Sequence, residues 1–155
     1  MNSSEQRTPR HLLVIIDHQG KRTYNLQASM YSIGRDESNA IVLKSDKISR
    51  QHAMLIRMPL PEGKGYRYKI QDGNLEGKKS VNGITVNGKQ VDSAELKNGD
   101  MIVFGGVVQA AYYLKNLTDR ELADYSKQPE YKSLKGRITD PEKTVVMVDE
   151  ELRSG

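Results

Sequence analysis

The amino-acid sequence predicts an all-β protein, an antiparallel β-sandwich of about eleven short strands followed by a mostly irregular C-terminal tail with one short helix. Three observations lead to this prediction. Short apolar or alternating segments recur along residues 11–114, turn residues such as Gly and Asn separate them, and an Asn87-Gly88 pair lies inside one alternating stretch. Short strands joined by tight turns at such intervals are typical of sandwiches.

The expected strands follow one another in a simple order. The apolar run 11–17 and the stretch 22–26 flank a turn at 18–21, which predicts a hairpin, and Asn87-Gly88 is the strongest short hairpin signal in the chain. The other strands are expected at residues 30–35, 40–43, 52–58, 66–72, 84–91 and, on either side of Gly105-Gly106, within 96–114.

Both ends of the chain differ from its middle. Residues 1–10 are polar and are expected to be disordered, so the sandwich domain is expected at 11–115. Residues 116–155 form the tail. Thr118 and Glu121 have the spacing of a capping box, which predicts a helix at about 119–127 ahead of a flexible C-terminus.

The composition and charge of the chain indicate which kind of partner it is suited to bind. Hydrophobic residues make up 36% and charged residues 28% of the chain, and the formal net charge is +4. The positive excess lies in residues 1–114, which carry 16 Lys and Arg against 11 Asp and Glu. A modest excess of this kind suits a small anionic partner, such as a phosphate group, better than a long polyanion.

Several kinds of site are excluded or not expected. The chain has no cysteine, which excludes disulfides and thiolate sites, and its three histidines lack the spacing of a zinc site. We therefore expect no metal and no cofactor. The N-terminus has no apolar leader and no apolar run is long enough to span a membrane, so the sequence predicts a cytoplasmic protein.

Three short motifs stand out in the first part of the chain. Gly34-Arg35 ends a predicted strand, Ser-Arg-Gln-His at 49–52 precedes one, and two Asn-Gly pairs lie within 80–88. Alone, each is an ordinary feature: a surface arginine, a polar loop, a pair of turns. Together, in this order and spacing on a sandwich pattern, they resemble the forkhead-associated (FHA) domain family over roughly residues 11–114.

The resemblance implies a binding function. FHA domains bind phosphothreonine peptides through loops at one end of the sandwich. Arg35 matches the arginine that contacts the phosphopeptide, Ser49 the serine whose hydroxyl donates to a phosphate oxygen, and Asn82 the asparagine that holds the peptide backbone. Arg50 adds a charge, and Lys47 is expected to favour an acidic third residue after the phosphothreonine. Such a protein would be no enzyme and would couple a Ser/Thr kinase pathway to a partner protein.

The same resemblance assigns supporting roles. His52 is expected to brace the loops by hydrogen bonds within the fold, while Gly34 and Gly83 supply freedom at turns. One position departs from the family pattern. Val81 stands where the family usually has Ser or Thr, whose hydroxyl contacts the phosphate, and the neighbouring Ser80 is the candidate substitute.

Alternatives to this function stay open. Lys78 and Lys79 either compensate for the missing hydroxyl or belong to a solvated basic loop. An enzyme is not expected, because no carboxylate is evident to orient Ser49 and His52 as a catalytic pair. A nucleic-acid-binding protein fits the basic bias, but the chain has no Trp and one Phe for stacking. A phosphate-independent scaffold on the same fold remains the main alternative because of Val81.

The tail offers one further hypothesis. Thr144 lies among acidic residues, and once phosphorylated it would let the domain bind its own tail. Thr139 and Thr8 are weaker candidates for the same role. In the alternative interpretation, the segment that begins at Thr144 simply adds a strand to a sheet edge.

Overall fold

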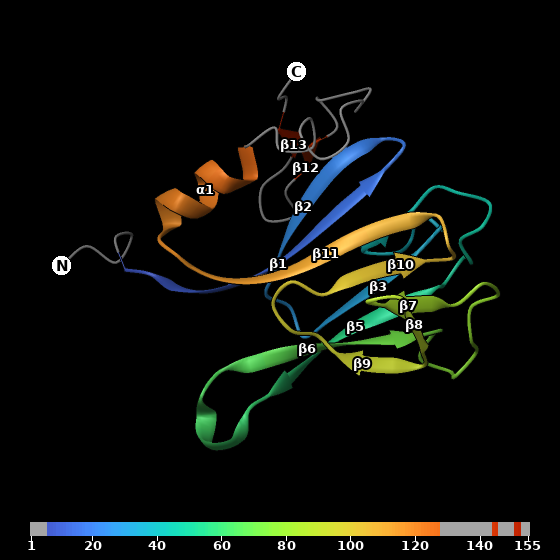
Figure 1. Cartoon of the computed structure of the whole chain (residues 1–155), viewed down its shortest axis with the longest axis horizontal. Coiled ribbons are helices and arrows are strands. Elements are labelled where there is room, and N and C mark those ends of the chain that lie inside the picture. The colour runs from blue at the N-terminus through green and yellow to red at the C-terminus, as the bar shows by residue number, and fades with distance from the viewer. Residues whose placement is uncertain (1–5, 128–143, 146–150, 153–155) are drawn as a thin grey trace. The chain divides into compact units, whose positions relative to one another are not determined.

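The computed structural model describes residues 6–127, 144–145 and 151–152. These residues belong to two compact units, one formed by Ala28–Gln109 and the other by Met1–Gln27 with Ala110–Gly155. The chain is mostly a β-sandwich of two sheets, and eleven strands precede the helix α1 (Asp119–Lys127) (Figure 1). The fold class predicted from the sequence is confirmed.

The unit Ala28–Gln109 contributes to both sheets. One sheet has the strand order β4-β3-β5-β6-β9, and the other includes β10-β7-β8. Neighbouring strands are antiparallel except for β3 and β4, which are parallel. The strands are β3 (Met30–Gly34), β4 (Ile41–Val42), β5 (Ala53–Pro59), β6 (Tyr66–Asp72), β7 (Ile84–Val86), β8 (Lys89–Val91), β9 (Ser93–Glu95) and β10 (Met101–Phe104).

Alternation of apolar residues builds the core of this unit. Leu55 in β5 pairs with Ile70 in β6, and both side chains are fully buried. The neighbouring pair, Ile56 and Lys69, is partly exposed, because successive side chains of a strand point to opposite faces. Phe104 in β10 is also fully buried. This period of two is the sequence pattern that predicted these strands.

The turn between β7 and β8 forms at the predicted Asn-Gly pair. Asn87 has φ of 53° and Gly88 has φ of 84°, the left-handed values that a two-residue type I′ turn requires. The Asn87 side chain also accepts a hydrogen bond from Met101 N at 2.9 Å and donates one to Asp100 Oδ1 at 3.0 Å. The turn is therefore tied to the start of β10.

The second unit combines both ends of the chain. It contains β1 (Thr8–Asp17), β2 (Gly20–Leu26), most of β11 (Val108–Leu117) and α1, with the strand order β2-β1-β11. Helix α1 occupies the predicted range. Its capping box is confirmed, because Thr118 Oγ1 accepts from Glu121 N and Glu121 Oε1 accepts from Thr118 N, both at 3.0 Å.

Two strands begin earlier than predicted, and one strand was missed. Strand β1 begins at Thr8, inside the segment expected to be disordered, and Arg10 anchors it by donating to Leu117 O at 3.1 Å. Lys21 was placed in a turn but lies in β2, where it is 1% exposed. Strand β9 was not predicted, because its three residues, Ser-Ala-Glu, are too few to show an alternating apolar pattern.

The tail is described only in part. The backbone of Thr144–Val145 pairs with Glu151–Leu152 as the short antiparallel strands β12 and β13. Among the described residues, the strand that pairs with this segment is therefore itself part of the tail. Thr139 lies outside the described residues, and Thr8 is exposed at the start of β1. Within the described part of the chain, no helix is long and apolar enough to cross a membrane.

Candidate functional site

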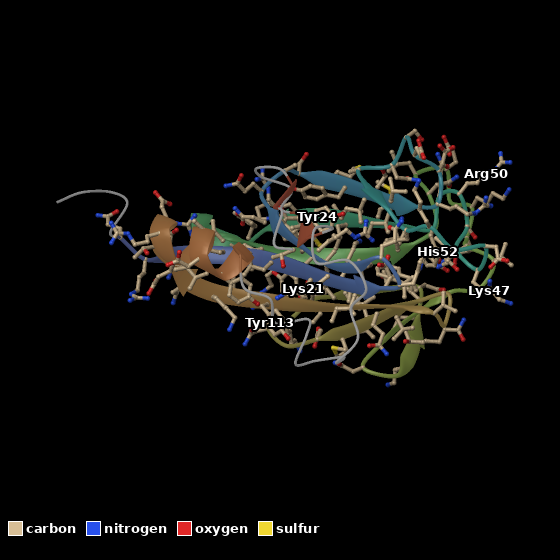
Figure 2. All side chains as sticks on the ribbon, turned by 90° about the horizontal axis from the view of Figure 1, so that it is seen from above. Lys21, Tyr24, Lys47, Arg50, His52 and Tyr113 are labelled. Atoms are coloured by element: carbon tan, nitrogen blue, oxygen red, sulfur yellow. The ribbon has the colours of Figure 1, made fainter. Side chains whose placement is uncertain are left out.

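Three loops at one end of the unit Ala28–Gln109 carry the residues that the sequence singled out. They are the β3–β4 loop with Arg35, the β4–β5 loop with Lys47, Ser49 and Arg50, and the β6–β7 loop with Ser80, Val81 and Asn82. Figure 2 shows Lys47 and Arg50 at the surface of this end and His52 further inside. The two cationic side chains are exposed at this end, whereas the histidine is fully buried.

Close backbone contact holds the first two loops together. Arg35 N donates to Ser49 O at 3.0 Å, and Asp36 N donates to Arg50 O at 3.3 Å. A Cβ atom on Gly34 would lie only 2.1 Å from Arg50 O, so glycine is needed here for space. Asn39, 8% exposed, closes the junction by donating from Nδ2 to Arg50 O at 2.7 Å.

A hydrogen bond to the protein backbone holds the guanidinium group of Arg35 at its Nε atom. Its Nε donates to Ile48 O at 2.9 Å, which fixes the direction of the side chain. No ion pair joins Arg35 or Arg50 to a carboxylate of the described residues. The terminal nitrogens of Arg35 are therefore available as a pair of parallel donors for an anion.

His52 connects the β4–β5 loop, the β6–β7 loop and strand β3. Its ring is fully buried, Nδ1 accepts from Ser49 N at 3.0 Å, and Nε2 donates to Gly83 O at 2.9 Å. Its backbone N donates to Ile33 O and its backbone O accepts from Gly73 N, both at 2.8 Å. Burial lowers the pKa of His52, which favours the neutral ring that these bonds require.

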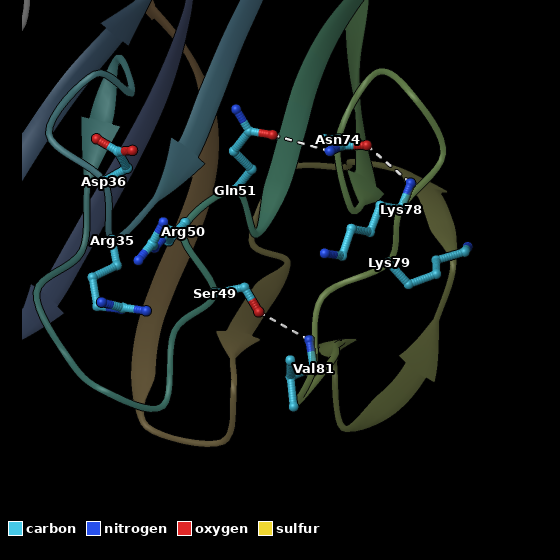
Figure 3. A pocket seen from close by; sticks show the side chains of 9 residues that line it. All are labelled: Arg35, Asp36, Ser49, Arg50, Gln51, Asn74, Lys78, Lys79 and Val81. Atoms are coloured by element: carbon cyan, nitrogen blue, oxygen red, sulfur yellow. Dashed lines mark hydrogen bonds between the residues drawn. The ribbon is translucent and has the colours of Figure 1, made fainter.

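Ser49 and Val81 face each other across the loops. Val81 N donates to Ser49 Oγ at 2.9 Å, so the hydroxyl oxygen is fixed while the hydroxyl hydrogen remains free to donate to a ligand (Figure 3). The Val81 side chain is 85% exposed. The backbone at position 81 thus positions a donor, although its side chain offers none.

The remaining predicted residues lie beside this centre. Asn82 Nδ2 donates to Lys47 O at 2.9 Å, which leaves the amide oxygen of Asn82 for a ligand. Ser80 Oγ accepts from Gly83 N at 2.9 Å and so stabilises the turn. Gly83 has φ of 77°, the left-handed value expected at a glycine turn.

The loops enclose an open pocket of about 460 Å³. Of the predicted ligand-binding residues, the pocket brings together three and leaves Lys47, Ser80 and Asn82 outside its lining. It is lined by Arg35, Asp36, Ser49, Arg50, Gln51, Asn74, Lys78, Lys79 and Val81 (Figure 3).

The pocket is electropositive. Four of its nine lining residues are cationic, and Asp36 is its one lining carboxylate. A hydrogen bond from Ser38 N lowers the pKa of Asp36, and the charges of Arg50 and Arg35 lower it further. Asp36 therefore remains ionised at neutral pH, and the surplus positive charge of the pocket favours an anionic ligand.

Sequence reasoning missed several residues that shape the site. Asn39 and Asn74 act through backbone hydrogen bonds of loops, and an isolated asparagine in a loop gives no distinguishing signal. Gly105 was expected only to separate two strands. A Cβ atom there would lie 2.7 Å from Lys47 O, so this glycine also leaves room for the β4–β5 loop.

No metal cluster and no hydrogen bond from the Ser49 hydroxyl to the His52 ring are found among the described residues. They contain no group of three or more His, Asp or Glu side chains that could hold a metal ion. Ser49 contacts His52 through its backbone N, while its hydroxyl oxygen accepts from Val81 N. The histidine ring therefore positions a loop in this arrangement, with both nitrogens bonded to backbone groups.

Comparison with known proteins agrees with this geometry. Protein sll1895 of Synechocystis sp. is 43% identical over 100 residues, which cover 64% of this chain but only 14% of that protein. The crystal structure of the Slr1951 protein from Synechocystis sp. is 39% identical and matches 66% of this chain and 96% of that one, with a TM-score of 0.62.

A second solved structure comes from a structural and functional analysis of phosphothreonine-dependent FHA domain interactions. It is 28% identical and matches 67% of this chain and 95% of that one, with a TM-score of 0.53. The family model of the FHA domain matches residues 31–105, which include all three loops of the pocket. On this sequence match and these structural neighbours, the chain belongs to the FHA domain family.

Proposed function

We propose that this protein is a phosphothreonine-dependent binding module that couples a Ser/Thr kinase pathway to a partner protein. One observation supports this above all others. Arg35, Arg50 and the Ser49 hydroxyl line one pocket, and neither arginine is paired with a carboxylate of the described residues. The FHA neighbour studied for phosphothreonine-dependent interactions supports the same ligand class.

Each side chain has a defined role in this proposal. A phosphothreonine brings about −1.5 to −2 charges and three acceptor oxygens. Arg35 donates two parallel hydrogen bonds, Ser49 donates its hydroxyl hydrogen, and Arg50 adds charge. Asn82 accepts from the peptide backbone through its free amide oxygen. Lys47, exposed beside Asn82, favours an acidic residue further along the peptide.

We extend the same proposal to the role of the whole protein. The protein acts as an interaction module without catalytic activity, in the cytoplasm. Its binding domain begins with strand β1 at Thr8, ahead of the expected start at residue 11. Ser80 serves the turn before Gly83, through the hydrogen bond to Gly83 N, in preference to replacing the hydroxyl that Val81 lacks. The partner is a phosphothreonine-containing protein, with phosphorylated Thr144 in the tail as one candidate.

Calorimetric titration with a degenerate phosphothreonine peptide pool tests the function. We expect binding by the wild type, none with the unphosphorylated pool, and none by Arg35→Ala. Arg67→Ala is the matched control, because Arg67 is exposed on β6 in an ion pair with Glu95 and lies outside the pocket lining. If no phosphate-dependent heat is detected, the protein is a phosphate-independent scaffold and the proposal is wrong.

A further inference from the structure

The cationic residues of the pocket come from two separate walls. Arg35 and Arg50 extend from the β3–β4 and β4–β5 loops, whereas Lys78 and Lys79 extend from the β6–β7 loop. Figure 3 shows the two arginines together on one side and Lys78 reaching toward them from the opposite side. Ser49 lies between these walls. A phosphate bound by Arg35 and Ser49 therefore leaves Lys78 facing a different part of the ligand.

The loop that carries Lys78 is built by specific hydrogen bonds. Lys78 N donates to Asn74 Oδ1 at 2.9 Å, and Asn74 N donates to Lys78 O at 3.0 Å. A Cβ atom on Gly73 would lie 2.3 Å from Lys78 O, so the loop closes this tightly only with glycine there. Asn74 Nδ2 also donates to Gln51 Oε1 at 3.0 Å, which connects the two walls. The backbone of Lys78 is thus held in place by the fold.

The two lysines differ in their partners. Lys79 Nζ lies 3.2 Å from Asp92 Oδ1, and Figure 3 shows its side chain pointing away from the arginines. Lys78 has no carboxylate partner among the described residues. Asp36, the carboxylate that lines the pocket, lies on the far side, beside the arginines. Lys78 is therefore the lysine of this loop that a ligand is placed to contact.

Resting on the proposed function, we propose that Lys78 forms a second anion-binding subsite of the pocket. The ligand class is then a phosphothreonine peptide that carries another negative group close to the phosphothreonine. A peptide that covers Lys78 removes water from its ammonium group, which is costly unless an anion replaces that water. A carboxylate or a second phosphate supplies such a group, and lysine binds either as a point charge.

Titration of defined peptides tests this subsite. One series contains a single phosphothreonine in a neutral sequence, a second adds Glu at each flanking position in turn, and a third adds a second phosphothreonine at the same positions. Each series is measured by calorimetry with the wild type, Lys78→Gln and Lys79→Gln. Lys79→Gln is the matched control, since it removes the same charge from the adjacent residue. Thermal melts establish that the variants are folded.

We expect an added anion at one or two positions to tighten binding to the wild type by about fivefold to tenfold. Lys78→Gln should lose this gain, measured as the ratio of its affinities for the acidic and the neutral phosphothreonine peptide, while Lys79→Gln should keep the gain. A gain from phosphate but not from Glu identifies a second phosphorylated residue as the natural feature, and a gain from both identifies any acidic group.

Two results would overturn the subsite. In the first, all peptides bind through phosphothreonine, yet no added anion helps. In the second, both lysine variants lose the gain equally, which indicates a general electrostatic effect with no site at Lys78. Either result leaves the proposed phosphothreonine function intact. Absence of phosphate-dependent binding in every series removes both the function and the subsite.

Discussion

At the scale of single residues, the site depends on atoms that approach closely. Gly34 lies so close to the backbone carbonyl of Arg50 that only glycine fits there, and the same carbonyl accepts a hydrogen bond from the Asn39 side chain. Both contacts fix the loop that carries Ser49 and Arg50. The geometry of the proposed phosphate-binding donors therefore rests on Gly34 and Asn39, which are not among the residues that line the pocket.

Gly34→Ala is expected to destabilise the protein by about 1–3 kcal/mol and to weaken phosphopeptide binding, because the added methyl group displaces the Arg50 carbonyl. Chemical denaturation and calorimetry measure the two effects. Gly106→Ala is the control. Its φ of 76° makes alanine costly by about 1–2 kcal/mol, but a Cβ atom there meets nothing within 4 Å. Unchanged affinity in Gly34→Ala would contradict the role given to this contact.

The buried histidines predict how stability depends on pH. Burial lowers the pKa of His11 and of His52 below the ordinary value of 6.5. Below about pH 6.5 the unfolded chain binds protons that the folded protein excludes, so the free energy of unfolding falls as the pH falls. The fall ends once the pH is below the folded-state pKa values.

Urea denaturation at a series of pH values measures this slope. His52→Gln and His11→Gln are each expected to lower the free energy of unfolding near neutral pH. In each variant this free energy should also fall less steeply as the pH is lowered, because one of the two histidines that take up a proton on unfolding is missing. A wild-type stability that stays constant between pH 7 and 5 would show that these histidines are not held neutral.

At the scale of elements, helix α1 shows how local chemistry defines a boundary. Thr118 and Glu121 exchange hydrogen bonds at its first turn, and Glu121 also pairs with Arg7 at 2.6 Å. The hydrogen bond from Thr118 N lowers the pKa of Glu121, and the Arg7 charge lowers it further. All these partners belong to the second unit, whereas the pocket residues belong to Ala28–Gln109.

Thr118→Ala is expected to destabilise helix α1 by about 1 kcal/mol, because Glu121 N loses its side-chain acceptor. Amide hydrogen exchange should speed up across the first turn of α1 while phosphopeptide affinity is unchanged. Thr118→Ser keeps the hydroxyl and should retain slow exchange. Equal exchange rates in the wild type and the alanine variant would show that the capping box contributes nothing to the helix.

At the scale of the whole molecule, the pocket is built by the unit Ala28–Gln109 alone. Deletion of residues 128–155 is therefore expected to leave phosphopeptide affinity unchanged within about twofold for unphosphorylated protein. Calorimetry with the shortened and full chains measures this. After kinase treatment, weaker binding by the full chain alone would support self-binding through Thr144, and weaker binding by both would contradict it.

Much of the fold and part of the site were predictable from local pattern. Alternation of apolar residues located β5 and β6, Asn87-Gly88 located the β7–β8 turn, and capping-box spacing located α1. Strand β9 was missed because its pairing partner, β6, is what makes it a strand. Patterns within a segment are visible in the sequence, whereas pairing between segments is not.

The sequence by itself determined which residues are present for the proposed phosphate binding: Arg35, Ser49 and Arg50 each have the chemistry in their own side chain. Only the tertiary structure decided how they are used. It assigned the Ser49 oxygen to Val81 N, buried His52 beneath the loops, and directed Lys78 toward the arginines and Lys79 away from them. Side-chain chemistry belongs to one residue, but direction and available partners depend on loops that are distant in the chain and meet only on folding.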